Sequence, residues 1–352
     1  MPETPDLTEA ALWAIRLFLG REPRDAAEVA HYAALGSLER LRAGMMRNPV
    51  ARGEFHRIVR DLEGYRVPLF LLRPAEAAGP VPFLFTPPSL ARPVSQLCTY
   101  GQFEEPDYAA WCAEMASVPG RRRKQWEFCW ILAALSAGGM LRPGLRALGF
   151  GTGREVLPAV LAKRGLDVLA TDAPAEGAFS ARWAAAGMHG RQLMDLHRPE
   201  ILDEASFARR VAWRAVDMNA IPEDLAGFDL CWSACALEHL GGIAAGLDFV
   251  ANSLRCLRPG GLAVHTTEFN LSSDTDTVEE KGLCLFRRRD IAALAARLAA
   301  EGHEVWPVNL HPGDRPVDEV IDLPPPGDPH LKLFVGRFVT TSIGIAVRKR
   351  RA

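Results

Sequence analysis

Three glycines alternate with other residues in the stretch LGFGTG of this 352-residue chain. They follow the apolar run LRAL and precede a helical pattern, which indicates a turn between a strand and a helix. Glycine at alternate positions lets the backbone of such a turn approach a ligand closely. In open α/β sheets, ligands bind at the carboxyl ends of the strands, where this turn should lie. We therefore predict a ligand site at Gly149, Phe150, Gly151, Thr152 and Gly153.

The spacing of the glycines excludes the common phosphate-binding patterns. A GxxxxGK[ST] loop is absent, and a dinucleotide turn needs a third glycine where Arg154 stands. Acids follow the next two predicted strands, at Asp172 and Asp217. A carboxylate about 20 residues past the glycines can accept hydrogen bonds from both hydroxyls of a ribose. These positions indicate a ligand that contains a nucleoside.

The order of these features resembles that of class I S-adenosylmethionine (SAM)-dependent methyltransferases. The similar segments are GFGTG, ATDA, AVDMN, FDLCWSACALEHL and LRCLRPGGLAVH, spread over about residues 120–350. The resemblance implies an α/β fold, with a Rossmann-like sheet of seven strands covered by helices on both faces, and SAM as the cofactor.

The same resemblance assigns further cofactor-binding residues. Asp172 and Ala173 would lie at the ribose, and Asp217 would accept a hydrogen bond from the adenine amino group. The backbone N–H of Met218 would donate to the adenine ring, and Ser233 would lie at the end of the fourth strand beside the cofactor.

One position departs from the family pattern. Most members have Asp or Glu two residues before the first glycine, near the SAM amino group, and this chain has Ala147. Glu155, directly after the turn, and Glu127, in KQWEFCW, are the candidates to replace that acid. The alternative for Glu127 is an ordinary residue on a helix surface.

Methyl transfer to a hydroxyl needs an aligned acceptor and a general base. His239 follows the fourth strand, and histidine as a residue type exchanges protons near neutral pH. The alternative role for His239 is to orient a loop. His265 and Glu268 stand at the predicted end of the fifth strand, so we expect both to face the same crevice as Glu238 and His239. The predicted catalytic residues are His239, Glu238, His265 and Glu268.

Two further groups bear on the acceptor. Glu238, His239 and His265 offer ligands to a divalent metal that would acidify a hydroxyl. Without the spacing of a zinc site, a hydrogen-bonded polar network without metal is the preferred interpretation. His330 and Lys332 lie in a long, proline-rich loop and are the predicted substrate-binding residues. The alternative is that the prolines only stiffen a surface loop.

Two basic runs, at 121–124 and 287–289, would suit a phosphate or an anionic glycan, although such runs are usually solvated faces. No aromatic residues interleave with them, which argues against nucleic acid as a substrate.

Finer resemblances suggest the acceptor and a partner. WSACALEHLGG, AVHTTEFN and PHLKL resemble bacterial methyltransferases of polysaccharide or surface-glycan assembly, which implies a sugar or glycan hydroxyl as acceptor. LWAIRLFLGREPRDAAEVAHYAAL resembles a small helical domain of glycan-associated bacterial proteins, which implies a protein partner. Three alternatives stay open: an O- or N-methyltransferase of another small molecule, a non-catalytic scaffold, and a nicotinamide oxidoreductase.

The elements that must position these residues alternate along the chain. Alternating strands and helices predict a mostly parallel sheet covered on both faces, with an antiparallel pair of late strands at its edge. Helices are predicted over much of 8–58 and over 126–137, 155–163 and 291–301. Strands are predicted over 145–148, 167–171, 211–216, 229–233, 261–266, 303–308 and 338–347. The predicted domains are a helical accessory domain (1–60), a proline-rich linker (61–107) and a SAM-dependent methyltransferase domain (108–352).

Composition narrows the class of protein further. The chain is 48% hydrophobic with a formal charge of −2, which gives no general attraction to nucleic acid or anionic lipid. Seven cysteines without a CxxC pair indicate reduced thiols and a cytoplasmic location. We expect no signal peptide and no membrane span.

Overall fold

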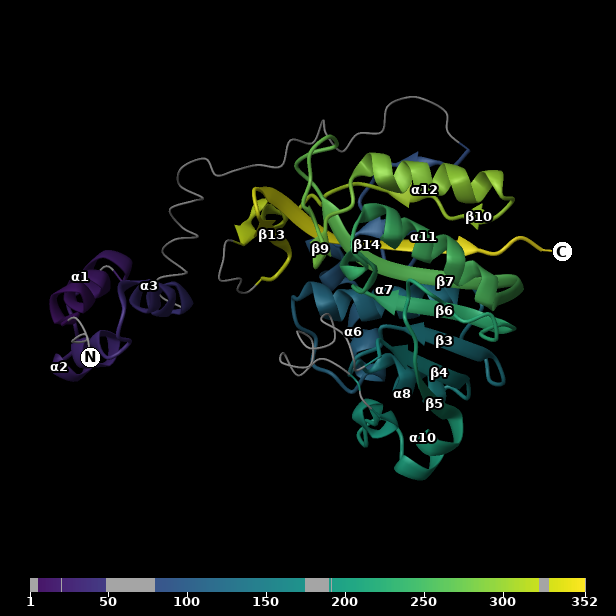
Figure 1. Ribbon diagram of the computed structural model, residues 1–352, viewed down its shortest axis with the longest axis horizontal. Coiled ribbons are helices and arrows are strands. Elements are labelled where there is room, and N and C mark those ends of the chain that lie inside the picture. The colour runs from purple at the N-terminus through teal and green to yellow at the C-terminus, as the bar shows by residue number, and fades with distance from the viewer. Residues whose placement is uncertain are drawn as a thin grey trace.

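The computed structural model describes residues 6–19, 21–48, 80–174, 190, 192–322 and 329–351 (Figure 1). The first described part is a unit of three helices around a small core that includes Ile15, Leu41 and Met45. Asp25 and Ser37 cap the second and third helices by accepting hydrogen bonds from backbone N–H groups. The helices are α1 (Thr8–Leu19), α2 (Ala26–Ala33) and α3 (Leu38–Arg47). The helical prediction is confirmed up to residue 47, and residues 49–58 lie outside the described part.

A single mixed sheet organises the second part of the chain. Its strand order is β1-β11-β2-β14-β7-β6-β3-β4-β5, and the five strands from β7 to β5 run parallel to one another. The strands of this path are β1 (Phe83–Leu84), β2 (Ser95–Leu97), β3 (Arg146–Phe150), β4 (Asp167–Asp172), β5 (Val211–Ala215), β6 (Phe228–Ala234), β7 (Leu257–Asn270), β11 (Val308–Asn309) and β14 (Phe338–Arg348). The Rossmann-like α/β architecture expected from the sequence is confirmed.

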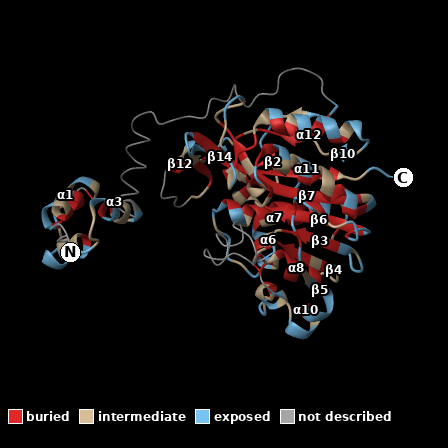
Figure 2. Ribbon diagram, viewed as in Figure 1, coloured by how far each residue is buried: buried red, intermediate tan, exposed pale blue. Residues whose placement is uncertain are grey.

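Helices cover both faces of the sheet, and each face has its own core (Figure 2). Successive side chains of a strand point to opposite faces. Leu230 and Trp232 therefore join the core under α7 and α8, whereas Cys231 joins the core under α11 and α12. The helices are α6 (Pro106–Glu114), α7 (Arg123–Ala137), α8 (Leu157–Lys163), α10 (Glu204–Arg210), α11 (Ile243–Ser253) and α12 (Arg288–Ala300).

The sheet is larger than the seven strands expected. It contains twelve strands in the described residues, including β10 (Glu304–Val305), β12 (Ile321–Asp322) and β13 (Lys332–Val335). A separate hairpin is formed by β8 (Glu279–Glu280) and β9 (Leu283–Cys284). Part of the difference comes from residues 80–107, which were expected to form a surface linker. Their strand β2 is buried between β14 and β11, because its backbone pairs with both.

The late strands are antiparallel as expected, but they do not form the sheet edge. Val305 of β10 pairs with Val347 of β14, while β14 itself lies between β7 and β2. Within the described part of the chain, no helix has the length and hydrophobicity that crossing a bilayer requires.

Candidate active site

The glycine turn follows β3 at the carboxyl edge of the parallel strands, where the sequence places it. Gly151 and Gly153 have φ angles of 59° and 49°, a region that favours glycine. A Cβ atom on Gly149 would lie 2.4 Å from the Trp232 ring, so packing also requires glycine there. The N–H of Thr152 donates to the Thr171 carbonyl oxygen at 2.9 Å, which fastens the turn to β4. Phe150 contributes only backbone to this edge, because its side chain packs edge-on against Phe249 in the core.

Asp172 is the last residue of β4 and lies directly beside this turn. Its two carboxylate oxygens accept hydrogen bonds from the N–H groups of Ala173, at 2.8 Å, and Gly190, at 3.0 Å. These two N–H groups hold the carboxylate at the strand end, beside the glycine turn. Asp217 follows β5 and is exposed. The sulfur of the next residue, Met218, lies 3.3 Å from the position that a Cβ atom on Gly151 would occupy. Three strand ends thus meet around the turn.

Both candidates for the missing acid are buried at the same edge. Ala147 itself lies in the core under α7. Glu127, on α7, is only 2% exposed and accepts hydrogen bonds from the Ser342 hydroxyl, at 2.6 Å, and the Cys235 thiol, at 2.9 Å. It is therefore not an ordinary surface residue. Glu155 is 8% exposed and accepts a hydrogen bond from the Trp232 indole N–H at 2.5 Å.

The electrostatics of this edge are dominated by carboxylates. Burial raises the pKa of Glu155 to about 8, and neighbouring Asp172 and Glu127 contribute in the same direction. Lys124 and the Trp232 hydrogen bond oppose this rise in the pKa. Lys124 also lies 3.3 Å from Glu127 Oε2. Three acids and one lysine therefore share a small volume, which suits a ligand that carries positive charge.

A second polar group lies beyond the end of β6. Burial raises the pKa of Glu238, which accepts a hydrogen bond from Thr267 at 2.9 Å. Glu268 forms an ion pair with Arg123 at 2.6 Å and accepts from Thr340 at 2.7 Å. Hydrogen bonds therefore hold both carboxylates near the carboxyl ends of β6 and β7, and their catalytic role stays a prediction.

Cys235 joins this second group, although the sequence analysis did not single it out. Its φ of 48° is one of two positive values at non-glycine residues in the described chain. Such backbone strain is concentrated at functional sites, and it was not visible in the sequence. Its sulfur and one oxygen each from Glu238 and Glu268 lie within 4.8 Å of one another. A metal ion bound at this edge would therefore have Cys235 as a ligand, and not His265 as predicted.

His239 lies on the short 3₁₀ turn η3 (Leu237–His239) after β6. Its Nδ1 is 2.7 Å from the carbonyl oxygen of Gly282, so Nδ1 carries the proton and donates. The other ring nitrogen, Nε2, lies 3.8 Å from Glu238 Oε1. Histidine in this tautomer is able to take a proton at Nε2.

The predictions that His265 faces the crevice and that Ser233 lies beside the cofactor were wrong. His265 is fully buried, with Nδ1 2.8 Å from the Ser233 hydroxyl and Nε2 3.1 Å from the Ser253 hydroxyl. Burial lowers its pKa to about 3, so the ring stays neutral. Strand β7 extends to Asn270, and His265 lies three residues before Glu268, hence on the opposite face. The side chains of His265 and Ser233 therefore belong to the core beside α11 rather than to the crevice.

The prediction that Lys332 binds substrate was also wrong. Lys332 is fully buried, and its Nζ lies 3.3 Å from Asp318 Oδ1 and from the Cys98 carbonyl oxygen. This ion pair joins β13 to the 3₁₀ turn η5 (Pro316–Glu319) before β12, so the lysine is structural. His330 is partly exposed, and its carbonyl oxygen accepts from the N–H of Arg123, which brings it to the start of α7. It therefore remains a candidate for contact with substrate.

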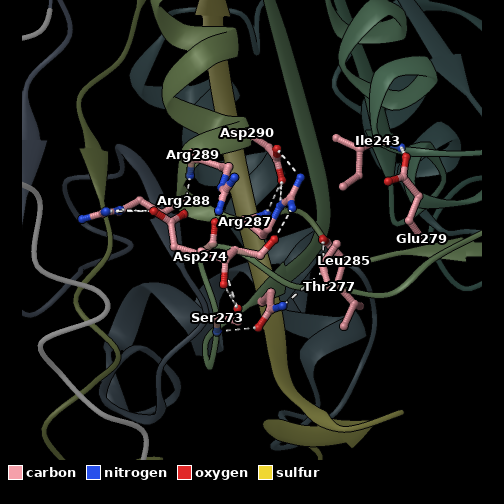
Figure 3. Close-up of polar contacts among 12 residues, drawn as sticks. Ile243, Ser273, Asp274, Thr277, Glu279, Leu285, Arg287, Arg288, Arg289 and Asp290 are labelled. Atoms are coloured by element: carbon pink, nitrogen blue, oxygen red, sulfur yellow. Dashed lines mark hydrogen bonds and ion pairs between the residues drawn. The ribbon is translucent and has the colours of Figure 1, made fainter.

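The two basic runs differ in their surroundings. In the first, Arg123 is buried and Lys124 donates to the Ala234 carbonyl oxygen at 2.7 Å, so two of its four members belong to the site. In the second, Arg287 pairs with Asp290, and Arg288 pairs with Asp274 (Figure 3). These partners offset two of the three positive charges of the second run, which therefore offers less charge to an anionic ligand than the sequence suggests.

Comparison with known proteins yields only distant structural similarity. No family model and no curated protein matches the chain. A magnesium protoporphyrin IX methyltransferase from Synechocystis PCC 6803, with S-adenosylhomocysteine (SAH) bound, has 14% identity and a TM-score of 0.38; the match covers 64% of this chain and 83% of that one. A SAM-dependent methyltransferase from Mesorhizobium loti has 16% identity and a TM-score of 0.34, with coverages of 61% and 98%. The [4+2]-cyclase SpnF has 15% identity and a TM-score of 0.38, with coverages of 74% and 98%.

Proposed function

We propose that this protein is a SAM-dependent O-methyltransferase that methylates a hydroxyl of a sugar or surface glycan. The observation that carries the proposal is the glycine turn beside Asp172, with two further buried acids at the same strand edge. Fold similarity alone would not support it, since one fold serves many functions. The acceptor class is supported by the sequence resemblance to glycan-associated methyltransferases and by the hydrogen-bonding carboxylates near the end of β6.

The residues at this edge fit SAM. Glycines keep the turn free of side chains, and Asp172 is positioned to accept from the ribose hydroxyls. Asp217 and the backbone of Met218 would bind the adenine. In the described structure, the buried Oε2 of Glu127 has no hydrogen-bond donor besides its ion pair with Lys124, so it retains capacity for the SAM ammonium group.

SAM would supply a methyl group on a positively charged sulfur. The residues of this chain would then orient the acceptor hydroxyl and remove its proton. His239 Nε2 is the group we assign as general base, because Nδ1 donates to the Gly282 carbonyl oxygen and Nε2 is the nitrogen on the Glu238 side. Glu238, beside it, would stabilise the imidazolium that forms.

Two further proposals concern the setting of the protein. All seven cysteines are free, which supports a reducing compartment such as the cytoplasm. Three large apolar side chains are exposed on the N-terminal helical unit, which supports a protein partner there. They are Trp13, Leu17 and Leu38.

A thermal shift tests the proposed cofactor. SAH at about 100 times its Kd should raise the melting temperature by about 2–4 °C, because binding to the native state contributes about 2.7 kcal/mol. NAD at the same concentration serves as the control and should leave the melting temperature unchanged. A shift with NAD alone would favour a nicotinamide enzyme, and no shift at millimolar SAM would favour a non-catalytic scaffold.

Binding of SAH should also release a proton from Glu155. With its pKa raised to about 8, Glu155 is largely protonated at pH 7. An ammonium group nearby favours the carboxylate, so the pKa should fall on binding and a proton should leave. Calorimetry at pH 7 in phosphate and in Tris reports the number of protons released. The Glu155→Gln variant keeps an acceptor for the Trp232 indole but should release fewer protons; equal release in both proteins would contradict this role.

A further inference from the structure

A cavity of about 450 Å³ lies at the amino ends of the parallel strands, opposite the candidate active site. It is bounded by the segment after α7, the start of β7 and the end of β14, close to the C label in Figure 1. Four arginines line it, and no acidic residue does: they are Arg142, Arg258, Arg348 and Arg351. Its volume lies in the range that small ligands occupy in proteins.

The arginine side chains are held largely by neutral groups. Arg348 donates from Nη1 to the Gly260 carbonyl oxygen and from Nη2 to the Gly138 carbonyl oxygen, each at 2.9 Å. Arg142 donates from Nε to the Gly139 carbonyl oxygen at 2.9 Å. These bonds position the guanidinium groups without neutralising their charge, and each group has five N–H donors in all.

Compensating carboxylates are scarce around the cavity. Arg258 forms an ion pair with Asp229, which also accepts from the N–H of Arg146. Among the described residues, no ion pair joins Arg142, Arg348 or Arg351 to an acid within 4.0 Å. In a chain with a formal charge of −2, this is a local concentration of positive charge in a concave surface.

Two glycines form part of the cavity wall. A Cβ atom on Gly138 would lie 2.4 Å from Leu262 Cδ2 and 3.2 Å from Arg348 Nη2, so packing requires glycine there. The Cβ position of Gly139 is open space, and its φ of 70° favours glycine. Backbone and arginine side chains therefore form the wall of the cavity together.

We propose that this cavity binds a small phosphorylated anion of about the size of a diphosphate. Guanidinium groups bind phosphate oxygens through paired hydrogen bonds, and their charge persists at any physiological pH. The site stands on the opposite edge of the sheet from the methyl-transfer site, so the proposal is independent of the proposed function.

Titration calorimetry with sodium pyrophosphate on the full chain tests this site. The double variant Arg142→Gln/Arg351→Gln should bind pyrophosphate at least 10-fold more weakly, since both side chains are at the surface and can be replaced without loss of packing. Arg337→Gln removes an exposed arginine on the turn before β14 and is the matched control, with binding unchanged. Circular dichroism melting of each variant confirms that the fold is retained.

Several outcomes would overturn the proposal. One is the absence of heat at millimolar pyrophosphate, and another is an equal loss of binding in Arg337→Gln, which would indicate a general charge effect. Two further probes apply if pyrophosphate does not bind the wild type. Binding of a short single-stranded oligonucleotide would assign the basic surface to a polymer, and binding of phosphatidylglycerol vesicles would assign it to a membrane.

Discussion

The Asp172→Asn variant should bind SAH about 100-fold more weakly than the wild-type protein. In the proposed function this carboxylate accepts hydrogen bonds from two ribose hydroxyls, and a hydrogen bond to a charged group contributes about 1.5–3 kcal/mol. Asparagine is nearly the same size, but it loses the charge and one acceptor oxygen. Calorimetric titration of SAH into both proteins measures the change in affinity.

A matched control lies on the same strand. Asp167 is the first residue of β4, at the opposite edge of the sheet, where it pairs with Arg210 at 3.1 Å on the surface. Asp167→Asn should bind SAH like the wild type. Because Asp172 also accepts from two backbone N–H groups, thermal unfolding of each variant must accompany the titration. A folded Asp172→Asn protein with wild-type affinity would rule out the ribose role.

Replacement of His239 by alanine should lower kcat by about 10²- to 10⁴-fold, the usual contribution of a general base. KM for SAM should change little, because we place His239 on the acceptor side. The Gly282 carbonyl oxygen accepts from Nδ1 and leaves Nε2 to receive the proton. Initial rates of SAH release at a saturating concentration of an acceptor sugar measure the loss of kcat.

His31→Ala controls for the loss of a histidine as such, since His31 is exposed on α2 in the helical unit. Its kcat should equal that of the wild type. If His239→Ala retains more than a third of the wild-type kcat, the proton leaves by another path, and His239 only orients the loop after β6.

Some errors of the sequence analysis were avoidable. His265 and Glu268 differ in position by three, an odd number, so a regular strand directs their side chains to opposite faces. The alternation of side chains along a strand is therefore enough to predict that these two residues lie on opposite faces of the sheet. Strand β7 is longer than the predicted strand at 261–266, because it already includes Pro259–Gly261 and runs to Asn270.

Other features had no signal in the sequence. Lys332 lies in a loop-like, proline-rich stretch, and only its pairing with Asp318 shows that it is buried. Likewise, the sequence around Arg123 is typical of a solvated basic run. Only the fold places Glu268, 145 residues further along the chain, next to this arginine. Such burial depends on long-range contacts, and charged residues are buried only where a partner compensates them.

The sequence by itself determined the succession of the five parallel strands, the glycine turn after β3 and the acid at the end of β4. Those features depend on local rules, namely the periods of strands and helices and the backbone freedom of glycine. Only the tertiary structure decided that β2 inserts beside β14, that Glu127 is buried rather than on a helix surface, and that His265 faces the core. Each of these outcomes depends on which distant segments pack together, and local sequence does not encode that packing on its own.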